Sequence, residues 1–316
     1  MAKILTLTLN PALDITVSLD ALRPGHVNRS HSQHSHAAGK GLNVAQVLAD
    51  LGHSVTVGGF LGRDNLEPFE ALIAWRGFAD CFVRVPGETR SNIKLVEADG
   101  RVTDINGQGP DVDEAAWIAL MRRLGQLAAG HDAVVVAGSL PRGVDARWFH
   151  QLLLQLKQQG LKIALDTSGE ALRAGLQVGP WLVKPNTEEL GEALGTEVHT
   201  AHAQRLAAER LLASGVEHVV VSQGEQGVTW FAQDGQALHG RPPKVQVAST
   251  VGAGDSLVAG MVHGLLLGEP PEQTLRRATA IAAQAVTQVG FGIRDREQLA
   301  RLQDAVQLTE QQEGCR

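Results

Sequence analysis

The sequence contains no tyrosine and only two cysteines. Cys81 and Cys315 stand far apart, so they provide no framework of disulfide bridges, and this usage favours a reducing cytoplasm. A long apolar run is also missing: residues 257–267 are too few to span a bilayer, and His263 interrupts them. Residues 1–10 alternate like a strand and lack the apolar centre of a signal peptide. We therefore expect a cytoplasmic protein without a membrane partner.

An excess of positive charge is absent too. The chain has 28 Lys and Arg residues against 34 Asp and Glu residues, a formal net charge of −6, which gives no support for a nucleic-acid partner. Any anionic substrate must then be met by local positive charge. With 316 residues and no repeat, low-complexity tract or linker, residues 1–316 are expected to form a single domain.

The dinucleotide-binding fingerprint is missing where it should stand. Residues 4–9 alternate like a half-buried strand, but residues 10–14, NPALD, follow them in place of Gly-x-Gly-x-x-Gly. This argues against an NAD-dependent oxidoreductase.

What the chain does contain is an alternation of apolar strands with helices. This rhythm predicts an α/β fold, with a mostly parallel sheet covered by helices on both faces. Ligands of such sheets bind at the carboxyl ends of strands, where we place Asp14, Asp166, residues 184–186 and Ser222. The other expected strands are 55–57, 133–137, 161–166, 181–184 and 218–222, and the expected helices are 42–51, 66–75, 114–129, 146–159 and 203–213.

Two β-rich pieces do not fit this rhythm. Residues 12–36 turn at Arg23-Pro24-Gly25, and residues 90–108 contain Asp99-Gly100, a strong hairpin signal. We expect them to form a small β-sheet lid inserted in the main domain.

The stretch from Ser249 to Ser256, STVGAGDS, is expected to open a helix after a β-like segment at 244–247. Glycines at a helix start allow close approach to free backbone amides, which suits a phosphate, and Asp255 would stand in the first turn. The alternative is an ordinary glycine-rich loop capped by an aspartate.

A second glycine-rich stretch, residues 38–45, reads AGKGLNVA and also opens a helix. It is not a phosphate-binding P-loop, because it lacks the earlier glycine and the Ser or Thr that binds Mg²⁺. Lys40 and Asn43 supply a cation and an amide for hydroxyls or phosphate. The alternative is a tight turn with a solvated lysine.

Together these stretches resemble a known family. Residues 39–45, followed by Gly52 and Gly62, resemble the N-terminal signature of the ribokinase-like (PfkB-type) sugar kinases, and residues 250–255 resemble their C-terminal signature. The two stand in the family's order, about 210 residues apart. Two signatures in the right order are far more specific than either alone.

Two further motifs extend the resemblance over residues 5–292. Residues 184–189, KPNTEE, are similar to the family's Asn-x-x-Glu motif, and residues 222–227, SQGEQG, to its nucleotide-contacting loop. Ser249 departs from the pattern, since many members carry Asp there, which puts a supporting contact in doubt.

The resemblance implies an ATP- and Mg²⁺-dependent sugar-phosphate kinase. Asp255 would be the general base, while the amides of Gly252, Ala253 and Gly254 would hold the charge of the transferred phosphoryl group. Glu189 would act on Mg²⁺ through bound water, although a solvated helix-face carboxylate is its alternative. The implied nucleotide-binding residues are Lys184, Asn186, Ser222, Gly224, Gly227, Ser249, Thr250 and Val251. A β-turn between strands is the alternative for residues 222–227.

The resemblance also implies a binding site for a hexose phosphate. Asp14 stands in a pattern seen in members that act on hexose phosphates, and Arg90 stands at the start of the lid. Arg90 would bind the phosphate already on the sugar, and opposite charges about 4 Å apart gain roughly 4 kcal/mol near a protein surface. The implied substrate-binding residues are Asp14, Gly39, Lys40, Asn43, Arg90, Ser139 and Arg142. A solvent-facing loop residue is an equal alternative for Arg142.

Residues 36–41 and 58–65 look most like the bacterial members that convert fructose 1-phosphate to fructose 1,6-bisphosphate. Members acting on fructose 6-phosphate or tagatose 6-phosphate are alternatives that the residues do not separate. A non-catalytic phosphosugar sensor is a remote alternative, against which the intact Gly252–Asp255 stretch argues. The family also implies a homodimer paired through the lid.

His31, His34 and His36 have no metal-site spacing, and we expect them to be solvated or lid-strand residues. The polar tail, 309–316, is expected to be disordered.

Overall fold

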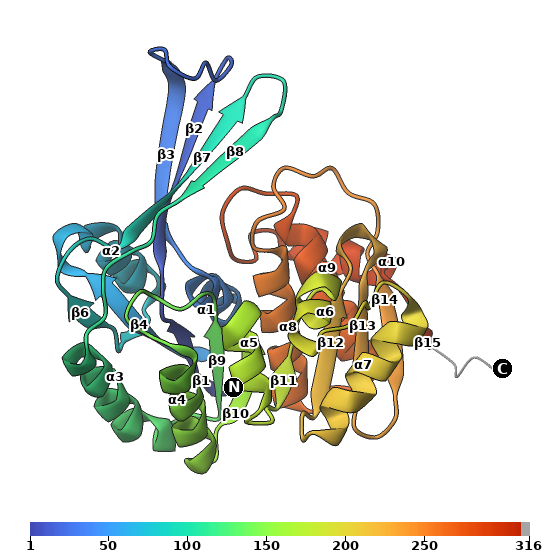
Figure 1. Cartoon of the computed structure of the whole chain (residues 1–316). Helices are drawn as coiled ribbons and strands as arrows, with labels where there is room; N and C mark the ends of the chain where they lie inside the picture. The colour runs from blue at the N-terminus through green and yellow to red at the C-terminus, as the bar shows by residue number, and fades with distance from the viewer. Residues whose placement is uncertain (311–316) are drawn as a thin grey trace.

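The computed structural model describes residues 1–310 and contains two sheets, a large one between helices and a small one that projects from it (Figure 1). The large sheet has the order β15-β14-β13-β12-β11-β10-β9-β1-β4-β5, and β6 also pairs with β4. Strands from β5 to β12 along this order run parallel, and β13, β14 and β15 add an antiparallel edge. Its strands are β1 (Lys3–Thr8), β4 (Ser54–Gly62), β5 (Ala79–Asp80), β6 (Val83–Val85), β9 (Ala133–Ala137), β10 (Lys162–Asp166), β11 (Leu182–Val183), β12 (His218–Ser222), β13 (Val228–Ala232), β14 (Ala237–Arg241) and β15 (Gln307–Glu310).

Helices cover both faces of this sheet, because its central strands are apolar on both sides. In β9, Val134 and Val136 pack into one core cluster, and Val135 and Ala137 pack into the other. The first cluster includes residues of α3 (Glu114–Leu127), α4 (Ala146–Gln158), α5 (Gly169–Leu176), α6 (Thr187–Leu194) and α7 (Ala201–Ala213). The second includes residues of α1 (Lys40–Asp50), α2 (Glu67–Arg76), α8 (Ala253–Leu267) and α9 (Pro271–Ala285), with α10 (Arg296–Ala305) beside α9.

The small sheet has the order β3-β2-β7-β8 and is built from the two β-rich pieces of the sequence. Its strands are β2 (Ala12–Leu19), β3 (Ser30–Ala38), β7 (Arg90–Glu97) and β8 (Val102–Asn106). The predicted hairpin turns at Gly100, whose φ is 87°, so that β7 and β8 are antiparallel. We call this sheet the lid sheet. One of its faces carries Asp14, His36 and Asn92 in one row, and the other is mainly apolar in β2 and β7 but carries Ser35 and Gln33 of β3.

The predicted α/β class is confirmed, and apart from one short β-like segment each predicted strand and helix of the main domain has a counterpart. The predicted β-like segment at 244–247 is wrong: these residues form an irregular loop after Pro242-Pro243, and proline removes a ladder donor. In the tail, Thr309 and Glu310 belong to β15, which contradicts the predicted disorder there, and residues 311–316 lie outside the described residues. Within residues 1–310, none of the helices has the length and apolar character needed to cross a membrane.

Candidate active site

Two helices begin side by side at the same cavity, each after a glycine. Gly39 precedes α1 with φ 138°, and Gly252 precedes α8 with φ 84°, a conformation that other residues rarely adopt. A Cβ on Gly39 would lie 2.5 Å from Cγ2 of Thr8, so the turn also needs glycine for space. Neither helix has a side-chain cap, and the free amides of both starts are therefore available to a ligand.

Asp255 stands in the first turn of α8, as predicted, and is only 6% exposed. Nδ2 of Asn43, from α1, donates a 2.8 Å hydrogen bond to Oδ2 of Asp255. Burial raises the pKa of Asp255 to about 6, and the nearby charge of Asp166 adds to this rise, while the bond from Asn43 opposes it. At neutral pH the carboxylate is thus ionised but basic, which suits a general base.

A buried carboxylate joins two lysines next to Asp255. Oδ1 of Asp166, at the end of β10, lies 3.2 Å from Nζ of Lys40 and 3.3 Å from Nζ of Lys184. Burial would raise the pKa of Asp166, but the two ammonium groups outweigh it and hold this pKa below its usual value. Burial also opposes the charge of Lys40, yet Asp166 and Asp255 keep the pKa of Lys40 above its usual value. Lys40 therefore stays charged where a phosphate would bind, and Lys184 shares its carboxylate partner.

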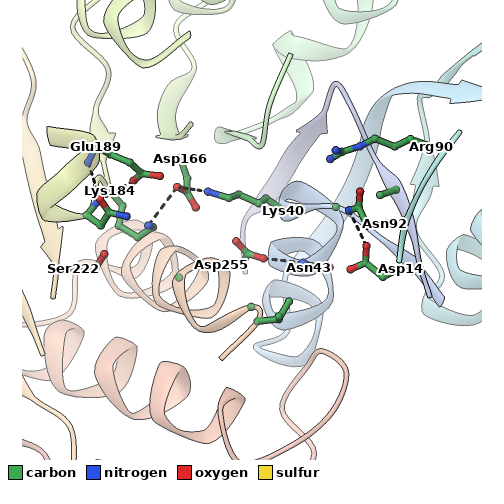
Figure 2. A pocket seen from close by; sticks show the side chains of 16 residues that line it. Asp14, Lys40, Asn43, Arg90, Asn92, Asp166, Lys184, Glu189, Ser222 and Asp255 are labelled. Carbon is green, nitrogen blue, oxygen red and sulfur yellow. Dashed lines mark hydrogen bonds and ion pairs between the residues drawn. The ribbon is translucent and has the colours of Figure 1, made fainter. Parts of the chain in front are cut away.

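The lid sheet supplies the other end of the cavity (Figure 2). Nδ2 of Asn92 donates to Oδ1 of Asp14 at 3.0 Å, and burial raises the pKa of Asp14 although this bond opposes the rise. Arg90 donates to the carbonyl of Asn10 at 3.2 Å, and no carboxylate of residues 1–310 lies within ion-pair distance of it. Its charge is therefore available to an anion. Asp14 lies inside β2, so the prediction that it follows a strand end is wrong.

Asn186 and Glu189 are locked together at the start of α6. The side chain of Asn186 accepts from the amide of Glu189 at 2.7 Å, and Oε2 of Glu189 accepts from the amide of Asn186 at 3.0 Å, which forms a capping box. Glu189 thus has a structural bond that the alternative of a solvated helix-face carboxylate does not include. Both side chains still line the cavity.

The cavity has a volume of about 380 Å³, and Figure 2 shows Asp14, Asn92 and Arg90 at one end, Glu189 and Ser222 at the other, and Asp255 and Lys40 between them. The predicted residues that line it are Asp14, Gly39, Lys40, Asn43, Arg90, Lys184, Asn186, Glu189, Ser222, Val251, Gly252, Gly254 and Asp255. The predicted residues that do not line it are Ser139, Arg142, Gly224, Gly227, Ser249, Thr250 and Ala253.

These remaining residues lie around the cavity in different ways. Gly224 lines an adjoining polar hollow that shares Asn186 and Ser222 with the cavity. Oγ of Ser139 accepts from Asn10 at 3.1 Å, and Oγ of Ser249 accepts from the amide of Val251 at 3.2 Å. Arg142 is exposed.

The predicted site lacks three lining residues, which are Ala12, Asn92 and Asp166. Asn92 lies in the predicted lid strand two residues after Arg90, and strand alternation places both on the same face. The sequence places Asp166 at a strand end but predicts no role for it. Its apolar strand ending in a carboxylate was the available signal.

Among the described residues, no group of three or more His, Cys, Asp and Glu side chains is placed to hold a metal ion. The oxygen donors of Asp166, Asn186 and Glu189 nevertheless line the cavity, and Oδ2 of Asp166 is buried with no partner. This donor set fits Mg²⁺, which keeps most of its waters and commonly binds through few carboxylates and the substrate's phosphates.

A mostly parallel sheet with free helix starts, a buried carboxylate and two paired lysines at one cavity is the arrangement expected of a phosphoryl-transfer enzyme. The chain belongs to the pfkB family of carbohydrate kinases, which residues 7–297 match. The predicted family is therefore confirmed, and as a kinase family it implies ATP as a substrate.

Relatives match almost the whole chain. A 1-phosphofructokinase from Vibrio cholerae is 48% identical over 307 residues, which are 97% of this chain and 96% of that protein. A 1-phosphofructokinase from Escherichia coli K12 is 45% identical, covering 97% of this chain and 98% of that one. A structure of phosphofructokinase-2 from Escherichia coli in complex with potassium has a TM-score of 0.88 and 31% identity, covering 96% of this chain and 99% of that one.

Proposed function

We propose that this protein transfers the terminal phosphoryl group of ATP to O6 of fructose 1-phosphate, which gives fructose 1,6-bisphosphate and ADP. The observation that carries the proposal is the position of Asp255: a buried carboxylate of raised pKa, in the first turn of α8 beside the free amides of that helix. The similarity to two 1-phosphofructokinases supports the choice of substrate.

In this reaction Asp255 accepts the proton of the sugar O6 hydroxyl as O6 attacks the terminal phosphorus. The bond between that phosphorus and the bridging oxygen breaks, and ADP leaves with the electron pair. The amides at Gly252, Ala253 and Gly254, together with Lys40 and Lys184, stabilise the charge of the transferred group. Mg²⁺, when bound through Asn186, Glu189 and Asp166, would neutralise the phosphate oxygens.

On the sugar side, Asp14 accepts hydrogen bonds from hydroxyls and Asn92 fixes its orientation. Arg90, which has no carboxylate partner among the described residues, binds the phosphate already on the sugar. The lid sheet would thus cover the sugar while the main domain binds the nucleotide.

The experiment that tests the proposal is a coupled assay of ADP release with fructose 1-phosphate, fructose 6-phosphate and tagatose 6-phosphate at matched concentrations. We expect the highest kcat/KM with fructose 1-phosphate and no ADP release without Mg²⁺. A higher kcat/KM with fructose 6-phosphate or tagatose 6-phosphate would make that sugar the substrate instead. If none of the three sugars caused ADP release, the proposed kinase activity would be rejected.

We also propose a cytoplasmic homodimer paired through the lid sheet. Leu13, Ile15 and Val17 of β2 alternate onto its apolar face with Ile93 and Leu95 of β7, and Ile105 of β8 on the same face is 53% exposed. A second copy would bury this face. The free, buried thiol of Cys81 fits a reducing compartment.

The dimer is tested by the mass in solution of Ile93→Glu, measured by light scattering. We expect a monomer, because a charge in the middle of the apolar face opposes its burial. Ile118→Glu is the matched control, since Ile118 is 50% exposed on α3 and away from the lid sheet, and it should leave the dimer intact. A wild-type monomer would reject the proposal.

A further inference from the structure

The ring of Phe291 lies between the lid sheet and the turn that starts α8. Its centroid is 5.8 Å from that of His36 in β3, with the rings tilted at 55°. A Cβ on Gly252 would also lie 2.6 Å from Cε1 of Phe291. The ring therefore packs directly against the glycine that sets the free amides of α8. Phe291 does not line the cavity itself.

The loop that carries Phe291 is fixed to the far end of α1. Phe291 stands between Gly290 (φ 93°) and Gly292 (φ 97°), so the chain turns sharply on both sides of the ring. Oδ2 of Asp50, the last residue of α1, accepts from the amide of Ile293 at 2.7 Å, and a Cβ on Gly292 would lie 2.5 Å from the same oxygen. The loop is thus tied to α1 next to the ring, and Figure 1 shows the red loop after α9 reaching toward the lid sheet.

His36 connects this ring to the sugar end of the cavity. It is the direct partner of Asp14 across β2 and β3, and Asp14 in turn pairs with Asn92 in β7. Phe291 therefore contacts both His36, which belongs to the row of lid residues that faces the sugar, and the turn that faces the phosphoryl group.

We propose that Phe291 is a positioning residue that aligns the anion-binding turn at Gly252 with the lid sheet. The proposal rests on the proposed phosphoryl transfer. Phosphoryl transfer depends on where the donors stand, and a misplacement of about 1 Å can lower a rate about a hundredfold. Without the ring, Gly252 has open space on one side. Because glycine has few conformational limits of its own, the turn could then change its backbone angles.

The first test is Phe291→Ala, assayed with whichever sugar phosphate the wild-type enzyme phosphorylates best. We expect kcat to fall about thirtyfold because the turn loses its support. The Kd of ATP, measured by calorimetry, should change less than threefold. Val289→Ala is the matched control in the same loop, because Val289 is 64% exposed, and it should keep wild-type kcat. A kcat of Phe291→Ala within twofold of wild type would overturn the proposal.

A double-mutant cycle separates alignment from simple packing. His36→Ala alone should raise KM for the sugar phosphate and lower kcat, whereas in the Phe291→Ala background it should lower kcat little further, since the contact is already lost. Full additivity of the two effects on kcat would reject the coupling. If Phe291→Ala does not fold, Phe291→Leu is measured instead. Leucine keeps bulk beside Gly252, so this variant should retain much of the wild-type kcat. Its coupling to His36 should be weaker, because the ring contact is lost.

Hydrogen exchange gives a readout that needs no turnover. The amide of Ser256 donates to the carbonyl of Gly252 at 2.9 Å, so its protection reports the geometry of the turn. We expect faster exchange at Ser256 in Phe291→Ala, and equal exchange would count against the proposal. If the wild type phosphorylates none of the three sugars, the proposed function fails, while this exchange result still decides whether Phe291 supports the turn.

Discussion

Asn43 and Asp255 are joined by a 2.8 Å hydrogen bond although they lie 212 positions apart in the chain. The bond occupies Oδ2 of the carboxylate, and no described residue donates to Oδ1. Oδ1 is thus the oxygen left to accept a proton, and its direction is set by a side chain of the neighbouring helix. The pair brings the two glycine-rich helix starts into one site.

Asp255→Asn should lower kcat by about a thousandfold, because a positioned general base contributes roughly 10²–10⁴ to the rate. The amide has nearly the shape of the carboxylate but cannot take the proton. ATP should still bind with a Kd within threefold of wild type, measured by calorimetry, while ADP release gives kcat. A kcat near that of the wild type would refute the assignment of the base.

The acid side of the pH profile should follow the pKa of Asp255, which is about 6. Below this pH the base is protonated, so kcat/KM should fall about tenfold for each pH unit. In Asp166→Asn the drop should move to lower pH, because the charge of Asp166 raises the pKa of Asp255. Asn43→Ala should move it to higher pH, because the lost bond favoured the ionised form. Shifts of the same sign in both variants would contradict this electrostatic account.

Asp255 should also lower the stability of the protein at neutral pH. Its pKa in the folded protein, about 6, lies above the usual 3.8, so the folded state binds the proton more tightly than the unfolded state. Its stabilising contribution is complete below about pH 4 and lost as the pH rises through 6, which amounts to about 3 kcal/mol. Asp255→Asn should therefore unfold at a higher denaturant concentration than wild type at pH 8, and this gain should shrink at pH 4. Equal midpoints at pH 8 would argue against the raised pKa.

Arg90→Ala should raise KM for the sugar phosphate at least tenfold and KM for ATP less than twofold. The reason is that Arg90 lies at the lid end of the cavity without a carboxylate partner among residues 1–310. Arg142→Ala is the matched comparison, since Arg142 is exposed and does not line the cavity, and it should change either KM less than twofold. Equal increases for sugar and ATP in Arg90→Ala would show that the residue supports the fold and not the sugar phosphate.

Local patterns predicted the helix starts well. Glycine at 39 and 252 is required where the backbone turns and packs closely, and that requirement is visible in the sequence itself. The β12–β15 edge was harder, because short antiparallel strands such as β14 carry little periodicity, and only β12 was predicted from the sequence. Its other strands are specified by their neighbours in the sheet.

The pairings within the cavity could not be predicted residue by residue. Asp166 meets Lys40 from a strand 126 positions away, and nothing local to either residue records that contact. The capping of α6 by Asn186 and Glu189 is visible in the sequence as Asn-x-x-Glu, a pattern that the family resemblance links to the metal. The side chains of this motif cap the helix and also line the cavity, so the two interpretations are compatible.

The bare starts of α1 and α8 have a consequence for how the folded state responds to its substrates. In most proteins a serine, threonine or aspartate completes such a helix from within the chain. Under the proposed function, the phosphates of the bound substrates would take that place at the starts of α1 and α8. The free energy of unfolding would then depend on the concentrations of these substrates in the cell. A ligand present at a hundred times its Kd adds about 2.7 kcal/mol to it.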